Sequence, residues 1–477
     1  MKTDQADEGA ITCGAPRWRL TIPYAVLLTT LVCLPVWPGQ MGYDGLYAYR
    51  SSLEGIETAV WPPMHAYLFW LSRAAGLGVG GLFAAQTFLI FFGVALSAAL
   101  MLRSRRLLLL ALAGFALSTV AVGPILGVML VHWRDVTTAS FAMASLALWL
   151  LAARWRSTAC LGLAALALGL GMSLRYNAFA LFVAIVPLMA WKPFLDKPAG
   201  ARVRGLAIGA LALSIGLAWA SVQWRLPDFK RLPAASTFTN VQVFDLLGVS
   251  ACDGQSHLPL AVTRGAALSV EQIRRLYDPR HVQLSFQPHP GIPRIYATRK
   301  FQTPQMRSDV DQAWRGVLRD HVGCYLAHRN AVARVQLGLT PGEVFYPTHG
   351  AIDDNPYGIR LARPAASQAV TAYVVQQASR WWSRPALLCA LAALVLMALA
   401  LRRDPRALVT GALLAGVAAN EALLYLVAPE ADARYLFPSN VFCAFVIAVG
   451  LGMLADRARA VQFGSLAPAK TQREEPK

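Results

Sequence analysis

Long apolar stretches separated by short polar loops constrain this chain more than any other feature of its sequence. A membrane-spanning helix needs about 20 mostly apolar residues, and ten stretches come near or exceed that length. They cover residues 20–37, 77–102, 107–130, 136–153, 157–173, 177–191, 205–222, 385–401, 407–427 and 436–455. Only 15% of the residues are charged, against about 25% in soluble domains. The sequence therefore predicts an all-α polytopic membrane bundle of about ten transmembrane helices.

The distribution of Lys and Arg among the loops predicts how the bundle is oriented. Twenty of these cations occupy the two chain ends and alternate short loops. The opposite short loops hold five, which are Arg50, Arg73, Arg134, Arg175 and Arg434. Because cytoplasmic loops carry the excess of positive charge, we expect both termini to be cytoplasmic in a bacterial inner membrane. The same dispersal argues against nucleic acid as a partner despite a net charge of +18, since phosphate neutralisation needs clustered cations.

A polar segment interrupts the apolar pattern between residues 223 and 384. Helical periodicities at Val270–Tyr277, Ser308–Leu339 and Ala365–Arg384 predict a mainly α or α+β periplasmic domain, inserted before the last three helices. The predicted parts are a cytoplasmic tail at 1–19, a transmembrane core of about seven helices at 20–222, the periplasmic domain at 223–384, about three C-terminal transmembrane helices at 385–455 and a cytoplasmic tail at 456–477.

The cysteines and histidines of the polar segment carry no recognisable metal-binding pattern. Cys252 and Cys324 are its two cysteines, and if the segment is periplasmic a disulfide between them is allowed, with two unpaired thiols as the alternative. The histidines of the segment are scattered along the sequence, and we assign them no chemistry. They are His257, His281, His289, His321, His328 and His349.

Charged side chains in the predicted outer loops form the candidate site, because a protein that only spans the membrane has no need of acids there. The candidates are Asp44, His65, Arg134, Asp135, Arg175, Asn177, Arg434 and Tyr435, together with Glu421 inside an apolar stretch. Carboxylates serve as bases, and arginines match phosphate oxygens bidentately. A carboxylate within a span is costly unless it is paired or faces water. This combination suits an anionic, lipid-linked substrate.

Four features of these loops carry a resemblance to a known superfamily. They provide Asp44 in the first outer loop, the Pro-Pro stretch at Pro62–Tyr67, the Arg134–Asp135 pair and the segment Ala433–Pro438. Together they resemble the GT-C superfamily of polyprenyl-phosphate-sugar-dependent glycosyltransferases, which includes protein O-mannosyltransferases and aminoarabinose transferases. The resemblance covers most of residues 20–220 and 385–455.

The resemblance implies a hexosyl or pentosyl transferase that moves a sugar from a polyprenyl-phosphate carrier to an envelope lipid, glycan or protein on the periplasmic face. Asp44 would be the general base, and Asp135 would orient the acceptor or donor. Arg134, Arg175 and Arg434 would hold the phosphate leaving group. The sequence shows no metal-binding triad, so a divalent cation is left open as a cofactor.

Each candidate residue also has a purely structural interpretation. Asp44 can cap a helix, Arg134 and Asp135 can form a surface ion pair, and Arg434 can extend from the head of its span toward the interface. His65 and His132 can simply pack between helices. Two further function classes stay open at this stage: a transporter or flippase of lipid-linked saccharides, and a non-catalytic envelope scaffold.

Overall fold

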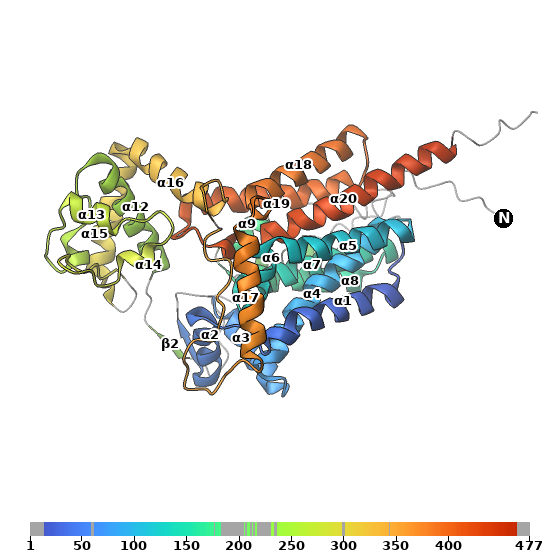
Figure 1. Ribbon diagram of the computed structural model, residues 1–477, viewed down its shortest axis with the longest axis horizontal. Helices are drawn as coiled ribbons and strands as arrows, with labels where there is room; N and C mark the ends of the chain where they lie inside the picture. Colours follow the sequence, from blue (N-terminus) through green and yellow to red (C-terminus); the bar gives the residue numbers. More distant parts are fainter. Residues whose placement is uncertain are drawn as a thin grey trace, which may run out of the picture.

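The chain forms a bundle of apolar helices with a separate group of helices at one end (Figure 1). The computed structural model describes residues 14–58, 62–175, 177–182, 230–232, 236–297, 301–342 and 344–464, with a few scattered positions between 205 and 216. Within these residues almost all regular structure is helical. The exception is a short parallel pair, β1 (Ile56–Thr58) with β2 (Lys230–Leu232).

Five helical segments of the described residues are long and apolar enough to cross a membrane. They are α1 (Trp18–Cys33) with η1 (Leu34–Val36), α4 (Gly78–Met101), α7 (Arg134–Trp155), α19 (Ala407–Val427), and η5 (Ala433–Leu436) continued by α20 (Phe437–Gly464). Several polar side chains of these segments hydrogen-bond inside the bundle. Gln86 of α4, for example, accepts a hydrogen bond from Thr137 of α7 at 2.9 Å.

The prediction of about ten spans is not confirmed. The apolar stretch 107–130 is broken into α5 (Arg105–Ala121) and α6 (Gly123–Met129), which are bent by 84°; counting this pair as one span gives six. Two further apolar helices, α8 (Thr158–Met172) and α18 (Pro385–Leu401), are shorter. The predicted spans 177–191 and 205–222 lie mostly outside the described residues, apart from α9 (Ala178–Phe182).

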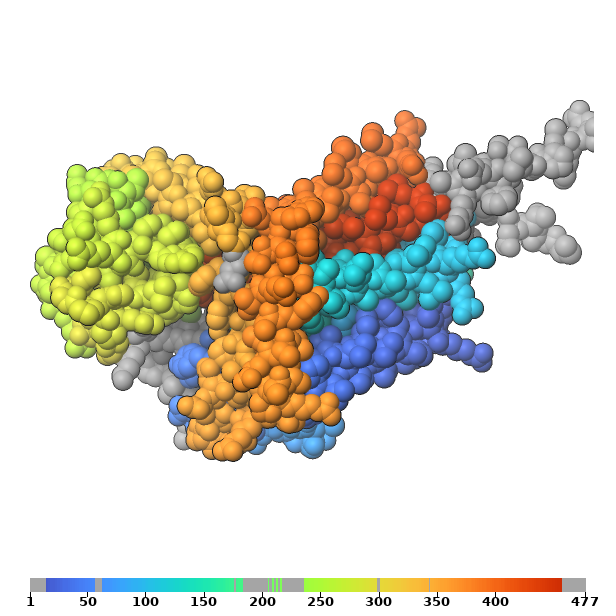
Figure 2. Space-filling model, in the orientation of Figure 1, coloured from blue at the N-terminus to red at the C-terminus, as the bar shows by residue number. Residues whose placement is uncertain are grey.

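The bend between α5 and α6 has a local cause. Val122 is extended, and Pro124 follows in the first turn of α6, where proline is tolerated. Gly123 faces the backbone of α17 (Pro364–Ala378): a Cβ there would lie 2.5 Å from the amide nitrogen of Ala378. Glycine therefore allows α17 to cross the end of the bundle, where it runs over the near face in Figure 2.

A buried glutamine fixes the first loop after α1 against this crossing helix. The side chain of Gln40 donates to Ser367 at 3.2 Å and Thr371 at 3.1 Å, both on α17, and accepts from Thr348 at 2.9 Å. Its amide oxygen also accepts from the backbone of Gly350. Since buried polar groups are costly when unpaired, this set of bonds holds the start of α2 (Tyr43–Glu54) in one position. A short helix, α3 (Met64–Ala74), follows the Pro pair.

The second group of helices, which we call the cap, is built from residues 236–336 and has its own apolar core. Its elements are α12 (Thr237–Asp253), η2 (Leu260–Thr263), α13 (Val270–Leu276), α14 (Val282–Ser285), α15 (Pro304–Asp320) and α16 (Val322–Gln336). The prediction of a helix at 270–277 is confirmed, and Ser269 and Gln272 form its capping box. The prediction of a single helix over 308–339 is wrong, because His321 is non-helical (φ −129°) and separates α15 from α16.

A buried ionic cluster joins the cap to the bundle. Asp245 of α12 pairs with Arg329 of α16 at 2.6 Å, and both side chains are fully buried. His328 and Trp314 contact the same carboxylate at 3.1 and 2.7 Å. Arg329 also donates to the carbonyl of Ala428, at the end of α19, at 2.8 Å. Removing any partner would leave a buried charge unpaired. This cluster therefore fixes the cap against the end of α19.

Cys252 and Cys324 form a disulfide, with their Cα atoms 5.7 Å apart. The structure thus selects one of the two alternatives that the sequence left open. The bond ties the end of α12 to the first turn of α16 across 72 residues.

Replacing Cys252 with Ser should lower the stability of the cap by about 2–4 kcal/mol, because a disulfide chiefly restricts the unfolded chain. Urea-dependent proteolysis of the purified protein, followed on fragments of the cap, measures this change. Cys160→Ser is the control, since Cys160 is a free thiol on α8. Equal resistance of the two variants would contradict the prediction.

Candidate functional site

A cavity of about 1130 Å³ lies where the ends of the bundle helices meet the cap. Ligand cavities commonly measure about 300–1,000 Å³, so this one is large enough for a sizeable substrate. Eight of the nine residues predicted from the sequence line it. They are Asp44, His65, Arg134, Asp135, Arg175, Asn177, Arg434 and Tyr435. The ninth, Glu421, lies on α19 outside the cavity lining.

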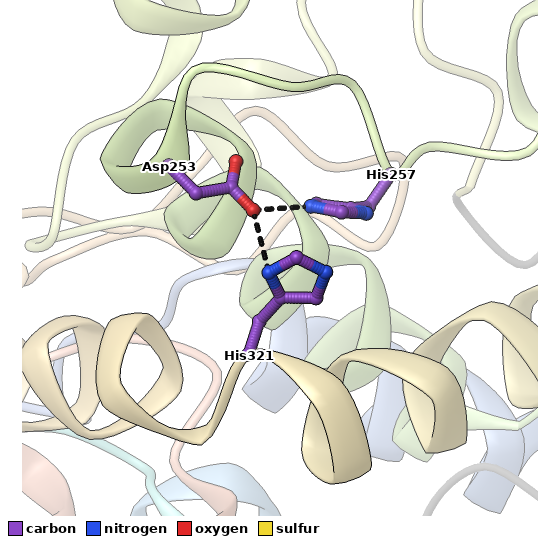
Figure 3. Close-up of side chains that lie close together, drawn as sticks. All are labelled: Asp253, His257 and His321. Carbon is purple, nitrogen blue, oxygen red and sulfur yellow. Dashed lines mark hydrogen bonds and ion pairs between the residues drawn. The ribbon is translucent and has the colours of Figure 1, made fainter.

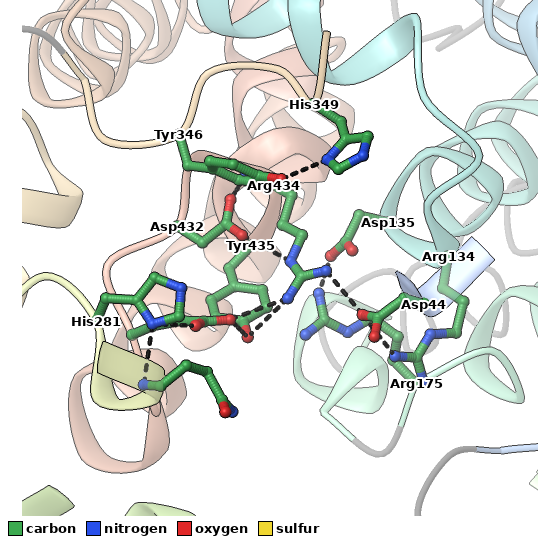
Figure 4. A network of polar contacts seen from close by, with 12 residues as sticks. Asp44, Arg134, Asp135, Arg175, His281, Tyr346, His349, Asp432, Arg434 and Tyr435 are labelled. Carbon is green, nitrogen blue, oxygen red and sulfur yellow. Dashed lines mark hydrogen bonds and ion pairs between the residues drawn. The ribbon is translucent and has the colours of Figure 1, made fainter. Parts of the chain in front are cut away.

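Arg434 lies at the centre of the charged network (Figure 4). Its guanidinium contacts three carboxylates that come from two parts of the chain. Nη1 donates to Asp44 at 2.7 Å, Nη2 donates to Glu430 at 2.9 Å, and Nε lies 2.8 Å from Asp432. Its backbone amide is capped by Asp432 as η5 begins. The interpretation of Arg434 as a side chain that only reaches toward the interface is therefore wrong.

Tyr435 and Glu430 extend the network toward the cap. The Tyr435 hydroxyl donates to Glu430 at 2.7 Å, and Nδ1 of His281, from the cap, lies 3.3 Å from the other oxygen of that carboxylate. The Tyr435 ring also lies under the guanidinium of Arg175, whose Cζ is 4.6 Å from the ring centroid. Such cation–π stacking stabilises a partly desolvated arginine. The cap thus contributes directly to the cavity wall.

Two more ion pairs complete the network on the bundle side. Arg175 pairs closely with Asp135, and Nη2 of Arg134 lies 3.6 Å from Asp44. Arg134 and Asp135 therefore pair with other residues, which replaces the interpretation of a local surface ion pair between them. Burial lowers the pKa of Arg175 to about 10, which still leaves the guanidinium charged at neutral pH.

Both predicted catalytic acids occupy the first turn of a helix. Asp44 lies in the first turn of α2, and Asp135 lies in the first turn of α7. The positive end of the helix dipole and the unpaired amides there favour an ionised carboxylate. The chain reaches this position through Gly42, where a Cβ would lie 2.8 Å from the ring of His349. A side chain at position 42 would displace either that ring or Asp44.

Two histidines, His65 and His132, are buried beside the charged network. Burial lowers the pKa of His65 well below its usual value and that of His132 to about 4. His132 hydrogen-bonds the carbonyl of Pro38 at 2.9 Å, and its ring packs against Phe69 and Phe83. His65 also packs on Phe69, so both histidines fit the packing interpretation, and both also line the cavity.

Sequence reasoning missed a second series of hydrogen-bonded polar side chains in the cavity wall. The Tyr346 hydroxyl hydrogen-bonds Nδ1 of His349, whose Nε2 lies 2.8 Å from Asp353. Tyr346 has φ +52°, a conformation that costs energy for a bulky residue and often marks functional sites. Burial raises its pKa to about 12. The spacing of these residues is too common in sequences to have identified them.

Comparison with known proteins does not give the chain a family. No family model matches it, and no curated protein matches it. Among solved structures it is similar to ArnT from Cupriavidus metallidurans in the apo state (15% identity, TM-score 0.32, 94% of this chain and 80% of that one). It is also similar to the same protein bound to undecaprenyl phosphate (16% identity, TM-score 0.32, 97% and 82%).

Replacing Arg434 with Gln should lower the free energy of unfolding by about 3–5 kcal/mol, because it leaves buried carboxylates without their cation. Unfolding in detergent, followed by tryptophan fluorescence, measures the change. Arg50→Gln is the control, since it breaks only the exposed Arg50–Glu54 pair and should cost no more than about 1 kcal/mol. Similar effects of the two changes would show that the Arg434 contacts contribute little.

Proposed function

We propose that this protein is a membrane glycosyltransferase that moves a sugar from a polyprenyl-phosphate carrier to an acceptor of the cell envelope. One observation carries the proposal: three arginines and two acids in the first turns of helices, from four loops far apart in sequence, line a single cavity at one end of the bundle. Several guanidiniums facing one space suit a phosphate, and apolar helices beside that space suit its lipid tail.

The proposed reaction is a direct displacement at the anomeric carbon of the donor sugar. The acceptor oxygen or nitrogen forms a bond to that carbon as the bond from the carbon to the phosphate oxygen breaks. Asp44 takes the proton of the acceptor, and polyprenyl phosphate leaves with its negative charge. Inversion at the anomeric carbon follows from a single displacement.

The arginine network gives Asp44 two states in this scheme. In the structure Asp44 is paired with Arg434 and Arg134, and an anion with two such partners is a weak base. A donor phosphate competes for the same guanidiniums and would free Asp44 to accept a proton. The same cations would then stabilise the charge that develops on the leaving phosphate, which is where preorganised charges contribute most to catalysis.

The remaining side chains would position these groups. Asp135 would hold Arg175, which stacks on Tyr435, so that Arg175 presents its free edge to the donor. Asn177 and His65 would contact the sugar or the acceptor from the cavity wall. Glu421, on α19, would act from within the bundle on the lipid side of the site. No group of three metal-binding side chains lies in the cavity among the residues that the structure describes.

We place the cavity on the periplasmic side of a bacterial inner membrane, with both termini in the cytoplasm, from the distribution of cationic loops. The disulfide of the cap supports this placement, because such bonds persist in oxidising compartments. In this arrangement residues 223–384 are periplasmic, residues 20–222 and 385–455 form the two membrane parts, and 1–19 and 456–477 are the tails.

Replacing Asp44 with Asn should reduce sugar transfer by about 10²- to 10⁴-fold, the usual contribution of a general base, with donor binding retained. Asp135→Asn should weaken donor binding as well, because it releases Arg175. Purified protein with radiolabelled lipid-linked sugars and envelope fractions as acceptor measures both. The matched control is Asp320→Asn, an exposed acid of the cap. Undiminished transfer by the Asp44 and Asp135 variants would remove the mechanism.

A further inference from the structure

The cap contains a second cluster of polar side chains, outside the cavity lining (Figure 3). It consists of Asp253, His257 and His321, whose potential ligand atoms all lie within 4.8 Å of one another. Nε2 of His257 is 2.5 Å and Nδ1 of His321 is 3.0 Å from the same oxygen of Asp253. We propose that this cluster is a binding site for a divalent metal ion of the zinc class.

The backbone conformation after α12 brings His257 close to Asp253. Asp253 ends α12, and Gly254 follows with φ +79°, the left-handed conformation that terminates helices and suits glycine. The chain therefore reverses and brings His257 back over Asp253. The backbone amide of Gln255 donates to the other oxygen of Asp253 at 2.9 Å, which fixes the orientation of the carboxylate. Outer contacts of this kind are a regular feature of metal ligands.

His321 comes from the opposite side, at the break between α15 and α16. The disulfide clamps the two sides together, because Cys252 adjoins Asp253 and Cys324 lies one turn beyond His321. The imidazole rings of His257 and His321 lie close together, with their centroids 4.5 Å apart and their planes tilted by 53°. This clamp brings together two histidines that are 64 positions apart in the sequence.

The three ligand atoms determine which metal ions suit the site. Two imidazole nitrogens and one carboxylate oxygen suit Zn²⁺ and similar transition ions, whereas Ca²⁺ and Mg²⁺ prefer sets of oxygen ligands. Zinc ligands lie about 2.0–2.2 Å from the ion, so tetrahedral ligands are roughly 3.3 Å apart. The present separations therefore need only small side-chain movements to admit the ion.

The site leaves one coordination position open. The side chains of Asp253, His257 and His321 are 13%, 16% and 32% exposed, so one side of the cluster faces solvent. Three protein ligands with a water in the fourth position characterise zinc sites that accept an outside ligand. The ion would thus both cross-link α12 to the α15–α16 junction and present an exchangeable position on the surface of the cap.

The test uses the full-length protein, purified with a tag that contains no histidine, stripped with a chelator and equilibrated with ZnCl₂. We expect the wild-type protein to retain one more equivalent of zinc than His257→Gln or His321→Gln, and each variant to bind at least tenfold more weakly. Only the protein with an intact cluster should give the strong visible absorption of tetrahedral Co²⁺. His289→Gln is the matched control, because His289 bonds the carbonyl of Leu284 away from the cluster.

A second measurement needs no variant and so does not depend on the folding of one. In the wild-type protein, Zn²⁺ should protect His257 and His321, but not His289, from a reagent that acylates imidazoles, with modification read by mass spectrometry. The inference is overturned if zinc protects neither histidine, or if wild type and both cluster variants retain equal zinc. In either case the three side chains form a hydrogen-bonded cluster only.

Discussion

The structure around the cavity depends on Arg434, a cation held among three carboxylates at the start of the last span. Taking charges out of water is costly unless each has a partner, and this guanidinium has three carboxylate partners from two parts of the chain. Asp44 belongs to the first loop, Glu430 reaches toward the cap through His281, and Asp432 caps η5. Arg434 therefore joins the first loop directly to the start of the last span, and the cap contacts this network through His281 and Glu430.

The same pairing connects structure to the proposed chemistry. A network that satisfies its own charges is stable without a substrate, yet its arginines are the groups that a phosphate recognises. Binding of the donor would exchange one anion for another rather than bury an unpaired charge. The zinc-class site in the cap belongs to a different part of the fold, because its residues meet through the disulfide and not through this network.

The sequence predicts the parts of this protein whose signals are local. Apolar length locates the five long apolar helices but not the ten predicted spans, and loop charges locate Asp44, Arg134, Asp135, Arg175 and Arg434, which line the cavity. The bend after Ala121 was missed because the apolar pattern runs through it, and the break at His321 because the helical periodicity continues on both sides. The pairing of His257 with His321, and the chain Tyr346–His349–Asp353, depend on tertiary contacts that no spacing reveals.

The central claim is that loops far apart in sequence share one charged network, and a double-mutant cycle between Asp44 and Arg434 tests it most directly. Their side chains are in contact at 2.7 Å across 390 positions. The free energies of unfolding of Asp44→Asn, Arg434→Gln and the double variant should therefore show a coupling of about 0.5–3 kcal/mol. Effects that add to within about 0.5 kcal/mol, as for distant sites, would contradict the account.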